Sequence, residues 1–343
     1  MSVTRRDLLK LAGAAGTLSL APAIVRAQKL EKSSVQIAVG GKALVYYLPL
    51  SIAEARGYFK DEGLSVSIAD FAGGSKALQA VVGGSADVCS GAYEHTINLQ
   101  SKGQFYRAFA LQGRAPMIVL GVSSKMGYKT PADLKGKKVG VTAPGSSTSM
   151  LVNFFLAKHG MKPSDVAFIG VGAGAGAVTA LRSGQIDAIA NLDPVMSALE
   201  TAGEIQVVLD TRKLKDTVDT FGGNMPAGCL YASQDFISAN PNTAQALTNA
   251  IVRADKWIAK ASPDEIAKAV PASYLLGEPE VYKASLTKSK EGISPDGSFP
   301  ADGAQTALKA LLSYVQMDES KIDLSKTFTN EFVKRANEKY ANG

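Results

Sequence analysis

Two kinds of hydrophobic pattern alternate along the chain after residue 28. Short apolar runs predict β-strands, and stretches with apolar residues at every third or fourth position predict helices. The strands are expected at residues 35–39, 64–68, 87–90, 105–111, 117–122, 139–141, 166–171, 187–190, 205–209 and 228–232. The helices are expected at residues 48–56, 76–82, 94–101, 150–158, 178–183, 243–260 and 303–315. This alternation is typical of an α/β protein with mostly parallel sheets and helices on both faces.

A short sequence pattern recurs at an offset of 100 residues. The pattern GxxAxxAxxxGxxD begins at Gly74 and begins again at Gly174. Each copy predicts a glycine-led helix, a turn and a strand of small residues. One αβ unit used twice predicts two similar lobes, and a ligand-binding cleft is expected between them.

The order of predicted elements also restarts near residue 138, so that a second series retraces the first. We expect lobe 1 to contain residues 28–118 and 219–343, and lobe 2 to contain residues 119–218. The two crossings between the lobes, near residues 113–122 and 212–226, would form a hinge.

The first 27 residues have the features of an export signal. Arg5 and Arg6 precede an uncharged apolar stretch at residues 11–25, which is shorter than the roughly 20 residues of a membrane-spanning helix. The paired arginines resemble a twin-arginine signal, and an ordinary secretory signal is the alternative. Either signal predicts export from the cytoplasm, with cleavage near Ala27.

Charge and composition narrow the possible function classes. The formal net charge of +6 falls to +3 without residues 1–27, which hold four basic residues and one acidic residue. This mild charge argues against a nucleic-acid partner and is compatible with a small anionic ligand. Cys89 and Cys229 lie in apolar segments, so buried free thiols are expected, with a disulfide as the alternative. No spacing of Cys or His in the sequence indicates a metal site, and no cofactor is expected.

Two glycine-serine segments stand directly before predicted helices. They are Gly73-Gly74-Ser75 and Gly145-Ser146-Ser147-Thr148. Free amide groups at a helix start can hold an anion, and Ser75, Ser147 and Thr148 would add hydroxyl donors. The alternative is that these side chains only cap their helices. We favour anion binding, because both segments would face one cleft.

Polar residues also follow the predicted strand in each copy of the repeat. Gly91, Tyr93 and Glu94 follow the first strand, and Asn191 and Asp193 follow the second. Ligands of open α/β sheets bind at the carboxyl ends of strands, so these residues are candidate ligand contacts. The alternative is that Glu94 and Asp193 stabilise the starts of their own helices. If both acids face the cleft, the ligand should carry donors or an amine as well as an acid group.

Three further side chains are candidate ligand contacts. Lys42 and Tyr46 follow the first predicted strand, and Arg114 at the first crossing could clamp an anion. Core packing of Tyr46 and a hinge salt bridge of Arg114 are the alternatives. The histidines, His95 and His159, lie near no serine or cysteine in a nucleophile motif. We therefore expect no enzymatic activity, and an exported enzyme acting on a small organic acid is the alternative.

One run in the first series carries a resemblance to a known family. The sequence PLSIAEARGYFKDEGL at residues 49–64 resembles the solute-binding proteins of nitrate, sulfonate and taurine ABC importers. The segments GGS, SADV, DLKGKKVG and GQIDA, which begin at Gly73, Ser85, Asp133 and Gly184, are similar to the same family. The family includes pyrimidine-precursor binders related to thiamine biosynthesis. The cysteine-rich motif of the related pyrimidine-synthesising enzymes is missing here.

The resemblance implies a periplasmic, monomeric protein with the type II periplasmic-binding-protein fold, in which two hinge crossings join two doubly wound αβ lobes. It implies capture of a small organic anion and delivery to an ABC permease in the inner membrane. The ligand contacts that it implies are Tyr46, Gly74, Ser75, Gly91, Tyr93, Ser147, Thr148 and Asn191. The bulky Tyr93-Glu94-His95 segment disfavours nitrate and favours a sulfonate or carboxylate with an aromatic or amine-bearing body. A binder of a pyrimidine-type heterocycle and a sensor for a membrane receptor are alternatives.

Overall fold

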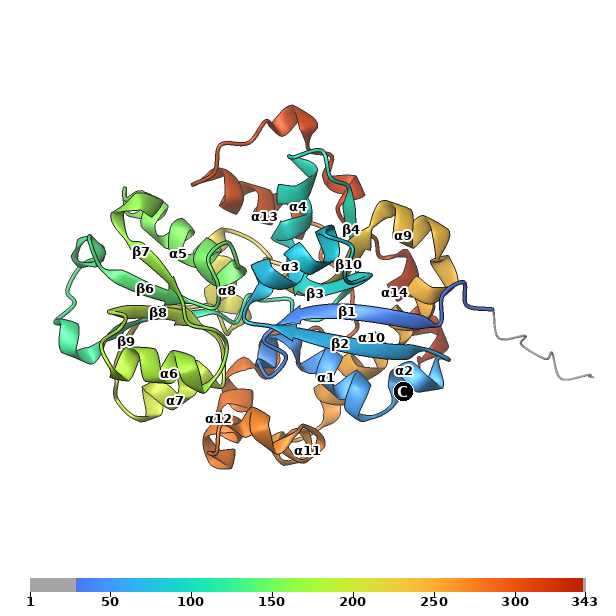
Figure 1. The fold of residues 1–343 in the computed structure, drawn as a ribbon, viewed down its shortest axis with the longest axis horizontal. Coiled ribbons are helices and arrows are strands. Elements are labelled where there is room, and N and C mark those ends of the chain that lie inside the picture. The colour runs from blue at the N-terminus through green and yellow to red at the C-terminus, as the bar shows by residue number, and fades with distance from the viewer. Residues whose placement is uncertain (1–28, 342–343) are drawn as a thin grey trace, which may run out of the picture.

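The structure is a computed structural model that describes residues 29–341. It contains two lobes, each built on a five-stranded sheet covered by helices (Figure 1). Lobe 1 holds the strands from residues 34–111 and 228–233, and lobe 2 holds those from residues 119–210. The expected export signal at residues 1–27 lies outside the described residues.

The sheet of lobe 1 has the strand order β2-β1-β3-β10-β4. Its strands are β1 (Ser34–Gly40), β2 (Ser65–Phe71), β3 (Val88–Ala92), β4 (Tyr106–Leu111) and β10 (Gly228–Ser233). β2, β1 and β3 run parallel, whereas β10 is antiparallel to its neighbours β3 and β4. The central strands β3 and β10 are almost entirely buried, which explains why their sequences are continuous apolar runs.

The sheet of lobe 2 repeats this arrangement in the order β7-β6-β8-β5-β9. Its strands are β5 (Val119–Ser123), β6 (Lys138–Val141), β7 (Ala167–Gly170), β8 (Ala188–Asn191) and β9 (Ile205–Asp210). β5 is antiparallel to β8 and β9, as β10 is in lobe 1. The expected mostly parallel sheets are confirmed, and each contains one reversed strand. Burial gives parallel and antiparallel strands the same apolar pattern, so that pattern did not predict their direction.

The sequence repeat is confirmed as one αβ unit used twice. In lobe 1 it forms α3 (Gly74–Val82) and β3, and in lobe 2 it forms α6 (Ala175–Arg182) and β8. Both helices begin directly after a glycine in an extended conformation, at Gly73 and Gly174. The repeated glycines and alanines thus form an equivalent helix–turn–strand unit in each lobe.

The other predicted helices are present with small changes at their ends. They are α1 (Leu48–Ala55), α4 (Glu94–Gln100), α5 (Ser147–Lys158), α10 (Pro241–Lys260) and α13 (Gly303–Leu312). The pattern missed α2 (Tyr58–Asp61), α7 (Val195–Thr201), α8 (Leu214–Phe221), α9 (Gln234–Ala239), α11 (Pro263–Ala269), α12 (Pro279–Ser289) and α14 (Glu331–Lys339). Capping signals could have located one of them. At the start of α11, Ser262 and Glu265 exchange hydrogen bonds of 3.2 and 2.8 Å, which form a capping box.

The expected lobe boundary at residue 219 falls inside α8. This helix packs on lobe 2, because the ring of Phe221 lies 4.7 Å from that of Phe154 in α5. The ammonium group of Lys158, also in α5, donates a 2.7 Å hydrogen bond to the carbonyl of Thr220. We therefore propose that lobe 2 extends through α8 and that the second crossing begins after Gly222.

A buried ionic cluster ties the C-terminal helices to lobe 2. We call it the Arg212 cluster, and it contains Asp193, Glu200, Asp210, Arg212, Lys288 and Ser289. The guanidinium of Arg212, a residue that is only 4% exposed, contacts Asp210 at 2.5 Å, Glu200 at 2.8 Å and Asp193 at 3.5 Å. From α12, Lys288 reaches Glu200 at 2.7 Å and Ser289 donates to Asp193 at 2.6 Å. The cluster therefore holds α12 beside α7, as Figure 1 shows.

Candidate functional site

The two predicted anion-binding segments lie directly opposite each other where the lobes meet. The amide of Ser75 at the start of α3 donates a 2.9 Å hydrogen bond to the hydroxyl of Ser146, which precedes α5. The hydroxyl of Ser75 donates to the carbonyl of Pro144 at 2.9 Å. The Ser75 amide is therefore occupied by the other lobe, and the start of α5 is the better candidate for an anionic group.

The two hydroxyl residues at the start of α5 have different surroundings. The hydroxyl of Thr148 accepts a 3.1 Å hydrogen bond from the amide of Thr142 and is buried inside lobe 2. The side chain of Ser147 is near enough to the hydroxyl of Tyr46, from lobe 1, to lower the pKa of that tyrosine against the larger effect of burial. Ser147 thus faces the junction between the lobes. Thr148 fixes the shape of the loop before the helix.

Glu94 and His95 bring unpartnered polar atoms to the junction from the start of α4. Their side chains are 4% and 3% exposed. Among residues 29–341, neither Oε1 of Glu94 nor Nε2 of His95 has a hydrogen-bond partner. A Cβ atom placed on Gly74 would lie 3.6 Å from Cε1 of His95, 3.7 Å from the hydroxyl of Tyr47 and 3.9 Å from that of Ser146. Side chains from both lobes therefore converge around Gly74.

Burial shifts the pKa values of these two groups in opposite directions. It raises the pKa of Glu94 to about 7, although a hydrogen bond from its own backbone acts against this shift. It lowers the pKa of His95 to about 4, against the effect of the neighbouring Gly145 backbone. At neutral pH His95 is therefore uncharged, and Glu94 titrates near neutrality.

Glu94→Gln is expected to remove a loss of folding stability that the wild type undergoes between about pH 4.5 and 7. The folded pKa of about 7 lies above the ordinary value of 4.5, so the wild type loses stability as pH rises through this window, by roughly 1.4 kcal/mol per unit of pKa difference. The variant should be more stable than the wild type at pH 8 by roughly 3 kcal/mol, and equal to it near pH 4. Urea denaturation at both pH values measures this. An unchanged difference between the two proteins would rule out Glu94 as the titrating group.

A second layer of side chains holds His95 in place. Its Nδ1 lies 3.1 Å from the hydroxyl of Tyr231 in β10, and the two rings meet edge to face. A Cβ atom on Gly91 would lie 2.9 Å from this hydroxyl and 2.9 Å from Sγ of Cys89. Gly91 therefore makes room for Tyr231. Tyr231 could not be predicted from the sequence, because a tyrosine in a distant apolar strand carries no local signal.

Two of the expected ligand contacts are engaged elsewhere in lobe 1. The hydroxyl of Tyr93 is 2.5 Å from that of Thr327, and its ring packs against Phe299 in the interior. The ammonium group of Lys42 pairs with Glu54 of α1 at 2.5 Å. We leave both residues out of the candidate site. One position further along the chain, the buried Glu94 carboxyl raises the pKa of Tyr46, and Oε1 of Glu94 has no hydrogen-bond partner within residues 29–341.

The side chains of Asn191 and Asp193, at and just after the end of β8 in lobe 2, also form hydrogen bonds with other parts of the protein. Asn191 donates a 3.0 Å hydrogen bond to the carbonyl of Gly172, and its own oxygen accepts from the amide of Leu192. The carboxylate of Asp193 belongs to the Arg212 cluster, whereas its carbonyl accepts a 3.0 Å hydrogen bond from the amide of Val45 in lobe 1. These residues link structural elements, and Glu94 is the acid that remains at the junction.

Arg114 lies apart from the junction in a basic surface pocket at the hinge. The pocket has a volume of about 310 Å³, and Lys213 and Lys290 also line it. The guanidinium of Arg114 donates a 3.0 Å hydrogen bond to the carbonyl of Glu291. Arg114 therefore stabilises the segment after α12, and its role as an anion clamp stays a prediction.

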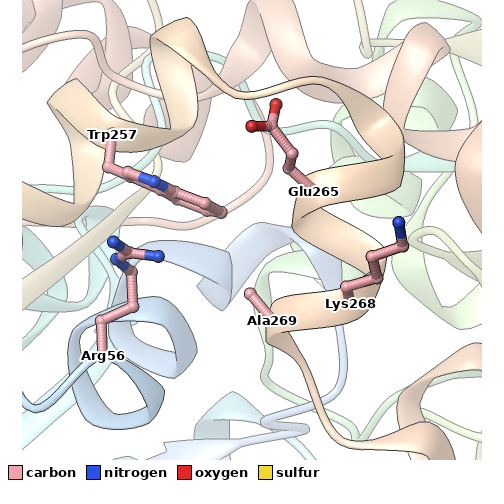
Figure 2. Close-up of a pocket in the computed structure, with 5 residues that line it drawn as sticks. All are labelled: Arg56, Trp257, Glu265, Lys268 and Ala269. Atoms are coloured by element: carbon pink, nitrogen blue, oxygen red, sulfur yellow. The ribbon is translucent and has the colours of Figure 1, made fainter.

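Another surface pocket, of about 430 Å³, lies on lobe 1 between α1, α10 and α11. Figure 2 shows Arg56 and Trp257 on one side of it and Glu265, Lys268 and Ala269 on the other. The guanidinium of Arg56 lies 4.6 Å from the ring centroid of Trp257, which is a cation–π contact. Because Trp257 is only partly buried, it lines this pocket as well as packing on the core.

Cys89 and Cys229 are both free and buried. Within the described residues, no group of three or more His, Cys, Asp or Glu side chains could hold a metal ion. Of the helices in residues 29–341, none has the length and hydropathy needed to cross a membrane.

Comparisons with known proteins point to one family and one fold. The family described as NMT1/THI5 like matches residues 45–266. A solved structure from Bordetella bronchiseptica RB50 is 75% identical, with a TM-score of 0.91, and the match covers 92% of this chain and all of that one. A Bacillus subtilis (strain 168) relative named as a binding protein, YtlA, is 26% identical over 74% of this chain and 75% of its own length.

The fold also occurs in a protein of known ligand class. The alkanesulfonate-binding protein SsuA from Xanthomonas axonopodis pv. citri, solved with MOPS bound, is 20% identical to this chain. Its TM-score is 0.67, and the match covers 88% of this chain and 99% of that one. At this identity the comparison establishes the fold, and the expected periplasmic-binding-protein fold is confirmed.

Proposed function

The chain belongs to the NMT1/THI5-like family, and we propose that it is the solute-binding component of an ABC importer, capturing a small organic acid between its lobes. The observation that carries this proposal is the buried polar junction. There His95 and Tyr47 from lobe 1 meet Ser146, just before α5 of lobe 2, around Gly74. Glu94, the residue before His95 in the sequence, is buried as well. Buried polar groups need partners, and a ligand between the lobes would supply them.

The start of α5 is the proposed site for the acid group of the ligand. The first amides of a helix have no partner within it, and the helix dipole favours negative charge there. Ser147 adds a hydroxyl at this position, and the hydroxyls of Tyr46 and Tyr47 lie on the facing lobe. A sulfonate or carboxylate fits these donors, and an aromatic or amine-bearing body would occupy the space towards lobe 1.

Transport also requires a location and a partner for this protein. We propose that the twin-arginine-like segment directs the chain to the periplasm and that a monomer delivers its ligand to an ABC permease in the inner membrane. Catalysis at the same site is less well supported. Burial raises the pKa of the Cys89 thiol to about 12, so this thiol stays protonated and is a poor nucleophile.

Ligand binding is expected to raise stability in a thermal-shift screen. A ligand that binds only the folded state at 100 times its dissociation constant adds about 2.7 kcal/mol. The panel should contain alkanesulfonates, aromatic carboxylates, amino-sulfonates and pyrimidines, and mass spectrometry should identify any molecule that copurifies with the protein. If no small molecule shifts the melting temperature and none copurifies, the proposed function is wrong.

A further inference from the structure

We propose that lobe 1 selects a ligand that carries a basic nitrogen. Its ammonium or amidinium group would pair with the Glu94 carboxylate, beside Tyr46, Tyr47 and Tyr314. This inference rests on the proposed function, because it concerns the same junction. It narrows the ligand from a small organic acid to a zwitterion. The cationic end would face Glu94 in lobe 1, and the acid end would face the start of α5 in lobe 2.

Glu94 is a buried acid without a countercharge. Its side chain is 4% exposed, and Oε1 has no hydrogen-bond partner among residues 29–341. Burial raises the pKa of Glu94, and a hydrogen bond from its own backbone lowers it. No lysine or arginine among the described residues contributes to the shift. An ionised carboxylate in a protein interior is costly unless it is paired. A cationic ligand group would supply the missing partner.

The groups around Glu94 are aromatic. Burial and then Glu94 raise the pKa values of Tyr46 and Tyr314, and Glu94 also contributes to the raised pKa of Tyr47, after burial and Cys89. The ring centroids of Tyr46 and Tyr47 lie 4.8 Å apart, and the ring planes meet at 81°, which is an edge-to-face contact. Aromatic faces attract ammonium groups, and aromatic cages are used to recognise them. Tyrosines beside a carboxylate therefore fit a cation better than a second anion.

The two basic residues predicted to bind a plain anion are engaged elsewhere. Lys42 pairs with Glu54, and Arg114 bonds to the carbonyl of Glu291 at the hinge. His95, the neighbour of Glu94, is uncharged at neutral pH because burial lowers its pKa to about 4. The lobe 1 side of the junction thus offers a negative group and neutral aromatic rings. An acid without a basic nitrogen would leave Glu94 unpaired.

Matched pairs of probes test this inference directly. Calorimetric titration at pH 8 would compare 3-aminopropanesulfonate with propanesulfonate, β-alanine with propionate, and 4-(aminomethyl)benzoate with 4-methylbenzoate. In the pair that binds, the basic member should bind about 10-fold tighter or more, as expected for a charged hydrogen-bonded pair. Glu94→Gln should abolish this preference. Glu331→Gln, which changes an exposed acid in the first turn of α14, should retain it.

Several outcomes would overturn the inference and leave the proposed function intact. These are equal binding of both members of a pair by the wild type, or an amine preference that survives in Glu94→Gln. A copurified or screened ligand without a basic nitrogen would also overturn it, even if the variant does not fold. Failure of every small molecule to bind is a different result, because it contradicts the proposed function itself.

Discussion

Gly73→Ala is expected to weaken ligand binding by roughly 5- to 150-fold, because the added methyl group would hold the lobes apart. A Cβ atom on Gly73 would lie 2.8 Å from Cβ of Ala143 and 2.9 Å from its amide nitrogen, both in lobe 2. Overpacking of this kind typically costs about 1–3 kcal/mol, which converts to that loss of affinity. Gly73 is extended, with φ of −174°, so alanine causes no backbone strain there.

The effect of Gly73→Ala should be confined to the closed arrangement of the lobes. Calorimetry with the tightest member of the thermal-shift panel would measure affinity, and small-angle scattering with and without it would measure closure. Gly174→Ala is the matched control, because Gly174 holds the equivalent position before α6 and a Cβ atom there meets nothing within 4 Å. Wild-type affinity in Gly73→Ala would show that the lobes do not approach here when ligand binds.

Arg212→Met is expected to lower the free energy of unfolding by about 3–5 kcal/mol, because it removes the buried central cation of the Arg212 cluster. Burial acts against ionisation of Glu200, but hydrogen bonds from Arg212 and Lys288 lower its pKa below the ordinary value. Without Arg212, the Asp193 carboxylate would stay buried, because the residue is only 1% exposed. It would keep the hydrogen bond from the Ser289 hydroxyl but lose its guanidinium partner. Methionine fills a similar volume, so the loss should reflect charge more than packing. Urea denaturation monitored by circular dichroism would measure it.

Arg182→Met provides the control for the Arg212 cluster. Arg182 also donates to a glutamate in lobe 2, Glu204, but its side chain is 50% exposed. Exposed pairs contribute about 0–1 kcal/mol, so this variant should be close to the wild type. Arg212→Lys should recover only part of the stability, since an ammonium group cannot contact three carboxylates with a planar fork. A loss below about 1 kcal/mol in Arg212→Met would mean that the cluster is not a major source of stability.

The two-lobed α/β fold could be predicted because its evidence is local. Buried strands appear as apolar runs, and the repeat beginning at Gly74 and Gly174 predicts an equivalent helix–turn–strand unit in each lobe. Strand direction was not accessible in this way. β5 and β10 are reversed because the chain enters each sheet from the other lobe, and their side-chain patterns do not record that path.

The candidate site was harder to predict because it depends on which way neighbouring side chains point. Tyr93 and Glu94 are adjacent in sequence, but the Tyr93 hydroxyl contacts Thr327 inside lobe 1, whereas Glu94 keeps a buried oxygen without a partner among the described residues and raises the pKa of Tyr46. Asp193 looked equivalent to Glu94, and its partner Ser289 lies 96 residues away in α12. Such long-range partners are created by the tertiary fold. The sequence could place candidates on the correct loops but could not choose among them.

The position of β10 sets the order in which the chain can complete its two sheets during synthesis. The strands of lobe 2 form one continuous segment from Val119 to Asp210, so this sheet can form as soon as that segment has emerged. The sheet of lobe 1 stays open between β3 and β4 until Gly228–Ser233 is available to fill the gap. Until then both strands present unpaired backbone groups, which invite aggregation. We therefore expect nascent lobe 1, rather than lobe 2, to depend on chaperones, and a chain that stops before residue 228 to aggregate.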